Sequence, residues 1–154
     1  MRKELKKFII YVICVFVIGF SAYFGYGYYQ SSKYDGTVVP YIQRVLPELS
    51  KWDPEVVKQY LAPEISKTIQ DENLQRIMAA LSQIGELQSI DTIKFKKKAT
   101  GKAGDLVQEP VITYTVHARY STGEAIVTLS LLDKGGVYEV YHFNFESAAL
   151  FKQQ

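Results

Sequence analysis

Apolar residues follow two patterns along the chain, one continuous run near the N-terminus and several short periodic segments after it. No charged residue lies between Lys7 and Lys33, a stretch of 25 residues. A helix of that length rises about 37 Å, which exceeds the roughly 30 Å of a hydrocarbon core. The pattern predicts a transmembrane helix over residues 8–28, preceded by a tail at 1–7 and followed by a polar linker at 29–34.

Charge and aromatic residues around the run predict its orientation. The positive-inside rule places the basic residues of the tail in the cytoplasm; they are Arg2, Lys3, Lys6 and Lys7. Tyrosines, which favour the lipid–water interface, mark the far end of the run; they are Tyr23, Tyr26, Tyr28 and Tyr29. We therefore expect a single-pass protein of a bacterial cytoplasmic membrane with its remainder periplasmic or extracellular. A cleaved signal peptide, ending near Gly19-Phe20-Ser21, is the alternative.

The segment after the linker predicts three helices. Apolar residues at helical spacing indicate the first helix from Asp35, a possible N-cap, to Trp52, with Pro47 expected to kink or shorten it. Asp53-Pro54-Glu55 has the residues of a helix start, and this second helix should end near Leu61. The third should be capped by Asp71 and end at Gly85. Its apolar stripe consists of Leu74, Ile77, Met78, Leu81 and Ile84.

From about Leu87 onward the apolar period changes from that of a helix to that of a strand. Strands are predicted from Leu87, over Val107–Tyr120, over Ala125–Leu132 and over Val137–Phe145, with Lys102 in a Gly-containing turn. Short Gly-containing turns join the last three, which predicts an antiparallel meander. Helices followed by strands indicate an α+β domain over residues 35–147, with three helices packed on a curved sheet of about four strands. Residues 148–154 are expected to be a C-terminal tail.

Charge and cysteine content exclude several functions. The formal charge of +2 comes from the tail, because the chain without residues 1–7 has 14 basic and 15 acidic residues. Such a domain lacks the basic stripe that binding to nucleic acid requires. Cys14 is the only cysteine, so neither an intramolecular disulfide nor a cysteine-rich metal site can form. Phosphate-binding loops, nucleophile elbows and metalloprotease motifs are absent from the sequence.

The two histidines are the remaining candidates for acid–base or metal chemistry. Alternation puts His117 on a face with Thr115 and Arg119. The same rule puts His142 on a face with Tyr138, Val140 and Asn144. The rings would meet if their strands adjoin, but only carboxylates remain as further metal ligands. We therefore predict no catalytic residue, no metal and no cofactor.

Two sets of residues suggest binding surfaces. The candidates for a pocket or partner surface are Trp52, Tyr60, Tyr114, Tyr120, Tyr138 and His142; aromatic residues of this kind are equally the ordinary filling of a small core. The lysines Lys94, Lys96, Lys97 and Lys98 could form a patch for anions or lipid headgroups. They could equally protect an exposed edge strand from pairing with other chains.

Several local features resemble the nuclear-transport-factor-2-like, or cystatin-like, superfamily of α+β rolls. They are Trp52-Asp53 at the start of the second helix, a helix ending in Gly85, and the closing segment Gly136–Phe143. The resemblance covers residues 35–147 and implies a curved sheet wrapped around the helices, often enclosing a pocket. The superfamily includes small enzymes and binding or assembly modules. Where its enzymes place paired acids and histidines, these strands offer mostly Tyr, Val, Ile and Phe, which disfavours catalysis.

The predicted function is therefore a non-enzymatic, membrane-anchored envelope protein. Residues 8–28 would contact the bilayer, and the domain would bind an envelope protein, a second copy of itself or a small apolar ligand, but no nucleic acid. The anchored architecture is also similar to the inner-membrane assembly component of type IV secretion systems. A structural subunit of a secretion, pilus or division assembly is accordingly the alternative, and a small pocket enzyme is the third hypothesis.

Overall fold

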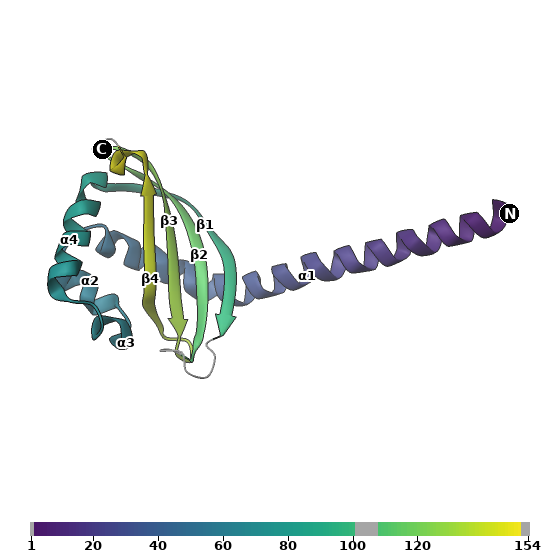
Figure 1. The fold of residues 1–154 in the computed structure, drawn as a ribbon, viewed down its shortest axis with the longest axis horizontal. Helices are drawn as coiled ribbons and strands as arrows, with labels where there is room; N and C mark the ends of the chain where they lie inside the picture. Colours follow the sequence, from purple (N-terminus) through teal and green to yellow (C-terminus); the bar gives the residue numbers. More distant parts are fainter. Residues whose placement is uncertain (1, 101–107, 152–154) are drawn as a thin grey trace. The chain divides into compact units, whose positions relative to one another are not determined.

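A computed structural model describes residues 2–100 and 108–151 (Figure 1). Lys102, predicted in a turn, lies outside the described residues. Contacts divide the chain into two compact units, Met1–Gly36 and Thr37–Gln154. The first is helical throughout its described part, and the second combines helices with one sheet.

Helix α1 runs without interruption from Arg2 to Leu49. It continues through residues 29–34, where the sequence predicts a linker, and Asp35 lies inside the helix instead of capping it. Residues 29–35 contain neither proline nor glycine, so nothing in the local sequence ends the helix there. The part Arg2–Tyr26 has a mean hydropathy of 2.3 over its most apolar window, none of which is buried, and is long and apolar enough to cross a membrane.

Within the second unit, the end of α1 contributes an apolar stripe to the core. Its fully buried side chains are Val38, Ile42, Val45, Leu46 and Leu49. They recur at three- and four-residue spacing, which places them on one face of the helix. The helix ends at Leu49, soon after Pro47, as expected for a proline that removes a hydrogen bond in the last turn.

Three shorter helices follow. α2 (Pro54–Tyr60) begins as predicted, because the side chain of Asp53 accepts a hydrogen bond from the Glu55 amide at 3.0 Å. α3 (Pro63–Ser66) was not expected; Pro63 starts a new helix two residues after the predicted end of the second helix near Leu61. α4 (Asp71–Leu81) continues into the 3₁₀ helix η1 (Ser82–Ile84), and Gly85 ends it at φ +92°.

Two details of the third predicted helix are wrong. The N-cap position is occupied by Gln70 and not by Asp71, and no side chain caps the helix there. Ile77, assigned to the apolar stripe, is 41% exposed. Leu74 and Met78 alone are buried within α4, so the stripe that faces the core is narrower than the sequence indicates.

The strands form one antiparallel sheet in the order β1-β2-β3-β4, so the predicted meander and the α+β class are confirmed. Their bounds are β1 Leu87–Thr100, β2 Pro110–Tyr120, β3 Gly123–Asp133 and β4 Tyr138–Ser147. Within the predicted C-terminal tail, Ala148–Leu150 form the 3₁₀ helix η2, which contacts β3 and η1.

The sheet has an inner face, packed in the core, and an outer face. Strand β2 alternates cleanly: Ile112, Tyr114, Val116, Ala118 and Tyr120 are at most 1% exposed and define the inner face. The same face of β3 contributes Ala125, Val127, Leu129 and Leu131, all buried. On the outer face of β2, His117 and Arg119 are exposed, whereas Thr113 is buried and forms a 2.9 Å hydrogen bond with Ser130.

Strand β4 is interrupted by a bulge at Tyr141, because Ser130 pairs with His142 and Leu131 with Val140. Beside it, the segment between α2 and α3 pairs with the edge of β4: the Ala62 amide donates to the Val140 carbonyl at 2.8 Å. This segment covers a second, small core on the outer face. Its members are Ala62 and Leu132, with Ile65, Val111 and Tyr141 packed against them.

Candidate functional site

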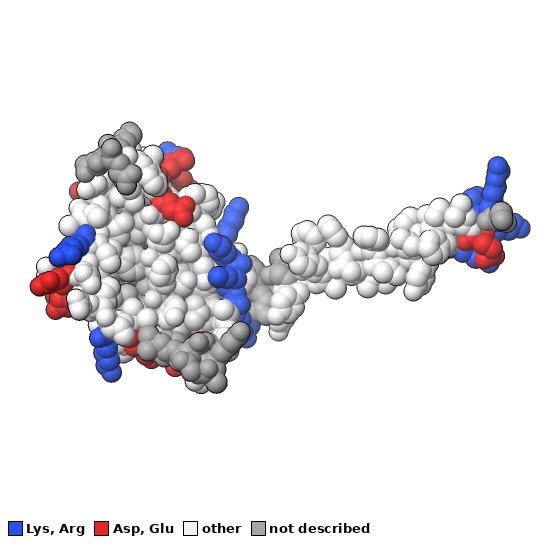
Figure 2. Space-filling view, in the orientation of Figure 1, with Lys and Arg blue, Asp and Glu red and all other residues white. Residues whose placement is uncertain are grey.

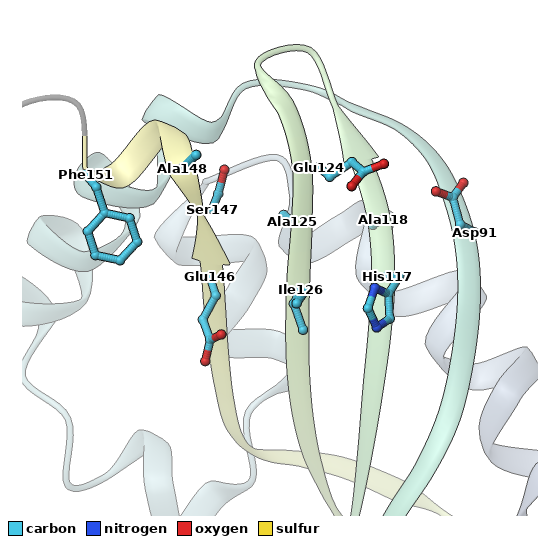
Figure 3. A pocket seen from close by; sticks show the side chains of 10 residues that line it. All are labelled: Asp91, His117, Ala118, Glu124, Ala125, Ile126, Glu146, Ser147, Ala148 and Phe151. Carbon is cyan, nitrogen blue, oxygen red and sulfur yellow. The ribbon is translucent and has the colours of Figure 1, made fainter.

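The outer face of the sheet contains a groove of about 560 Å³ at the end where β2 turns into β3 (Figure 3). All four strands contribute to it. Its lining residues are Asp91, His117, Ala118, Glu124, Ala125, Ile126, Glu146, Ser147, Ala148 and Phe151. The groove is therefore built on sheet positions and on the turn of η2.

Strand register places three different side chains in one row across the floor of the groove. His117 on β2 pairs with Ile126 on β3, and Ile126 pairs with Glu146 on β4. Neighbouring strands lie about 4.8 Å apart, so an imidazole and a carboxylate flank an aliphatic side chain. Figure 3 shows these three side chains at one level of the sheet. Ile126 is 38% exposed, which leaves its apolar surface accessible to a partner.

Carboxylates and one aromatic ring surround this row. Asp91 and Glu124 lie on β1 and β3, and Phe151, 71% exposed, lies beyond the end of β4 (Figure 3). Each carboxylate has a polar neighbour, because Ser89 donates to Asp91 at 3.2 Å, Asn144 to Glu146 at 3.2 Å, and Arg119 lies 3.7 Å from Glu124. The groove thus combines apolar surface with a polar, mainly acidic rim.

A second groove, of about 890 Å³, lies between the end of α1 and the start of β1. Trp52 forms part of it, with a left-handed backbone at φ +58°. Its indole N–H donates to the Gly85 carbonyl at 2.8 Å, so the ring joins the α1–α2 connection to the end of η1. Such a hydrogen bond stabilises the fold. The lining of this second groove is more polar, and it has fewer exposed apolar side chains than the lining of the outer groove.

The aromatic residues predicted as candidates for a pocket or partner surface do not form one site but lie in separate parts of the domain. Trp52 and Tyr120 do come together: both rings contact Phe145, with centroids 5.2 and 6.5 Å away. The Tyr120 hydroxyl lies 2.8 Å from Ser50 Oγ, and burial raises the pKa of Tyr120 to about 12. Tyr114 is fully buried and meets Phe95 edge to face at 5.6 Å. These three aromatic residues belong to the core and its border.

Tyr60 and Tyr138 lie elsewhere, near Tyr41. The Tyr138 ring lies 5.7 Å from that of Tyr41, and its hydroxyl lies 2.6 Å from Thr37 Oγ1. The pKa of Tyr41 is raised to about 12, mainly by burial; among the smaller influences Arg44 lowers it, and Tyr60 and Glu139 raise it. These tyrosines form a separate cluster, at the end of the sheet opposite Trp52.

The set of residues predicted to share a face of β4 with His142 is wrong in part. The bulge at Tyr141 reverses the alternation, so His142 shares the outer face with Asn144 but not with Val140, which is buried on the inner face. The two histidines also do not meet, because β3 separates their strands and His142 pairs four positions further along β3 than Glu146. Among the described residues, no group of three or more His, Cys, Asp or Glu side chains is placed to hold a metal ion.

Of the residues that line the outer groove, sequence reasoning singled out only His117; those it missed include Asp91, Glu124, Ile126, Glu146 and Phe151. One indication was present. Ile126 alternates with Glu124 and Thr128 on the polar face of its strand, and an aliphatic residue there marks an apolar spot on a solvent-facing surface. Whether Glu146 lies on the groove side of β4 depends on the bulge in that strand, and no sequence pattern predicts the bulge.

No family model matches the chain, and neither a curated protein nor a solved structure shows significant similarity to it. The resemblance to the nuclear-transport-factor-2-like superfamily therefore stays a prediction, and the function has to be argued from the chain's own residues.

Proposed function

We propose that this chain is a membrane-anchored binding protein whose domain takes a segment of a partner protein in the outer groove. The observation on which the proposal depends is the exposed Ile126 in the floor of that groove, flanked by His117 and Glu146. Apolar surface within a polar rim is the usual composition of a protein-binding site.

The anchor is supported by the first unit. Its apolar segment Arg2–Tyr26 has 25 residues, and side chains such as Phe16, 72% exposed, and Tyr23, 79% exposed, are left uncovered by the other residues that the structure describes. A lipid environment removes this surface from water. With the basic tail in the cytoplasm, the domain faces the periplasm or the cell exterior. A periplasm-active reporter fused after Gln154 should be active, and an inactive fusion would contradict this topology.

A protein segment suits the domain better than a small apolar ligand. Side chains of the core, among them Ile42 and Leu46 of α1 and Tyr114 of β2, are fully buried. Their burial favours a packing role for the interior over the binding of a small apolar ligand. The outer groove is open to solvent along the sheet and therefore suits a chain segment of a partner.

The test uses two exposed isoleucines of nearly equal accessibility. A photo-crosslinking amino acid at position 126 should capture a defined envelope protein in intact cells, and Ile126→Glu should abolish its binding. Ile77 on α4, 41% exposed against 38% for Ile126, provides the matched control Ile77→Glu. Equal binding by both variants, or equal loss in both, would contradict the assignment of the groove.

Self-association through the same face is the second candidate, as expected for a subunit of an assembly. The groove end of this face has the acidic residues Asp91, Glu124 and Glu146, and the other end of β1 has the lysines from Lys94 onward. A two-fold axis between two facing sheets would bring acidic and basic ends together. Crosslinks at position 126 that join only two copies of the chain would favour this candidate over a separate partner.

A further inference from the structure

The exposed edge of β1 is distinguished by lysines that have no acidic partner. Lys94, Lys96 and Lys97 are exposed, and none of them takes part in an ion pair with a described residue. Elsewhere in the domain Lys51, Lys58, Arg119 and Lys134 all lie within 4 Å of a carboxylate; their partners are Glu48, Glu55, Asp71, Glu124, Glu64 and Glu139. Arg44, Lys67 and Arg76 likewise have no ion pair with a described residue, but each lies on or beside a different helix, whereas β1 has three such lysines within four residues.

A bulge in β1 spreads these lysines around the edge. Phe95 pairs with Tyr114 and Lys97 with Thr113, so Lys96 has no partner position on β2. Lys94 and Lys97 consequently both lie on the outer face, with Lys96 between them. Figure 2 shows basic side chains stacked along this border of the domain. Closely spaced ammonium groups repel one another, which an anionic surface would relieve.

The lysine edge lies at the end of the domain where the chain enters from the apolar helix. Thr37, the first residue of the domain, meets Tyr138 at the start of β4 with 2.6 Å between their hydroxyl oxygens. Tyr138 on β4 pairs with Asp133 on β3. Next to Asp133 on the same strand, Leu132 pairs with Val111 on β2, and Val111 pairs with Ala99 on β1. Entry point and lysine edge therefore share one end of the sheet, three strand spacings or about 15 Å apart.

Acidic residues occupy different positions. At the entry end Glu109 lies just before β2, and the other acidic residues lie on the β3–β4 side, where Lys134 Nζ is 2.9 Å from both Glu64 Oε1 and Glu139 Oε2. At the opposite end of the sheet the unneutralised carboxylates Asp91 and Glu146 border the outer groove. Asp91 precedes Lys97 on β1 by about 20 Å at strand spacing. The domain thus has a basic corner near its attachment and an acidic end far from it.

We propose that the lysine edge binds anionic lipid headgroups and thereby orients the domain on the membrane, with the outer groove directed away from the bilayer. The inference rests on the membrane anchor proposed above. Residues 29–36, the stretch between the apolar segment and the domain, span at most about 28 Å even when extended, so the tether holds the domain within reach of the headgroups. Each lysine near an anionic surface strengthens association about fivefold, so three together contribute about a hundredfold.

The experiment uses the full chain in vesicles from which the domain projects outward. In a Cys14→Ser background, a fluorophore is attached at Ala99→Cys beside the lysine edge or at Gln83→Cys at the opposite end, and lipids with a quenching headgroup report proximity. The Ala99 label should be quenched at least about twofold more in phosphatidylcholine containing phosphatidylglycerol than in phosphatidylcholine alone. The Gln83 label should not respond, and about 1 M salt should remove the difference.

Charge variants then identify the residues. K94Q/K96Q/K97Q should abolish the dependence on lipid charge, and K94R/K96R/K97R should retain it. K51Q/K58Q/R76Q, which removes three cations outside β1, should also retain it. Circular dichroism checks that each variant is folded.

The outcomes separate the inference from the anchor. A chain that does not float with the vesicles overturns both. A chain that floats, with equal quenching of the Ala99 label in neutral and anionic vesicles, overturns the inference alone. Unchanged quenching together with new self-association of K94Q/K96Q/K97Q would show that the lysines only protect the edge strand.

Discussion

The two faces of the sheet use the same strands for different purposes. On the inner face, β2 and β3 contribute only aliphatic and aromatic residues, from Ile112 to Leu131, and all are at most 2% exposed. On the outer face, the residues between them range from buried Thr113 to exposed His117 and Ile126. Stability is therefore determined mainly on one face, and the other is free to vary for recognition. Substitutions on the two faces should accordingly have unlike effects.

The largest effect is expected on the inner face. Leu129→Ala should lower the free energy of unfolding by about 2–5 kcal/mol, because the fully buried leucine leaves a cavity in a packed core. The adjacent outer-face variant Thr128→Ala should lower it by less than about 1 kcal/mol. Urea unfolding of the full chain in detergent, followed by circular dichroism, measures both. Similar losses in the two variants would refute the division between the faces.

A smaller loss of stability is expected for Gly85→Ala, at the border between the helices and the sheet. Gly85 and Gly136 share a φ of +92°, but a Cβ on Gly85 would clash with Ser121 Oγ, whereas one on Gly136 meets open space. Ser121 Oγ also accepts a hydrogen bond from the Glu86 amide at 3.0 Å.

Backbone strain should therefore cost about 1–2 kcal/mol at either glycine, and Gly85→Ala should lose about 1 kcal/mol more. The thermal unfolding midpoints of Gly85→Ala and Gly136→Ala test this order. If Gly136→Ala is at least as unstable as Gly85→Ala, the clash between the new Cβ at position 85 and Ser121 Oγ is relieved without loss of stability.

The third effect concerns the hydroxyl at the border of the core. Tyr120→Phe removes the hydrogen bond to Ser50 and should cost about 1 kcal/mol. In the double variant with Ser50→Ala the two losses should not add, because both remove the same bond. Additive losses in this double-mutant cycle would mean that the bond contributes nothing to stability.

Alkaline pH should weaken the same region. The pKa of Tyr120 is raised to about 12 by burial, above the 10.0 of an exposed tyrosine, so the folded state holds its proton more tightly. Stability is then fully present below pH 10 and falls as pH rises from about 10 to about 12. A pH series of unfolding midpoints measures the fall, which Tyr120→Phe should make shallower. Tyr41 and the ion-paired Lys51, Lys58 and Lys134, whose pKa values are also raised, contribute to the remainder.

The smallest effect on stability is expected at the histidines. His117→Ala and His142→Ala remove exposed side chains of the outer face and should change the free energy of unfolding by less than about 0.5 kcal/mol. His142→Ala, at a position outside the outer groove, should also leave any cellular phenotype intact. Loss of a phenotype in a folded His117→Ala protein that still binds its partner would support acid–base chemistry in the groove, where this imidazole is accompanied by carboxylates.

The inner face could be predicted from the sequence, and much of the outer face could not. The alternation in β2 and the cap at Asp53 are local patterns, and both were confirmed. The bulge at Tyr141 adjoins the contact between Ala62 and Val140, two residues far apart in the chain, so no local pattern reveals it. That bulge changed the face of His142 and determines which residues of β4 reach the groove. The outer groove was therefore missed, although the strands that form it were found.

The contact of Ala62 with Val140 also has a consequence for the time course of folding. The helical segment that covers the edge of β4 is synthesised long before that strand, and the Ala62 amide finds its carbonyl only when β4 is in place. The three hairpin steps of the meander involve close neighbours in sequence and can form early, whereas closing this long loop comes late. Until then the small outer core around Leu132 is uncovered. A chain truncated before β4 should accordingly remain a substrate for chaperones and proteases.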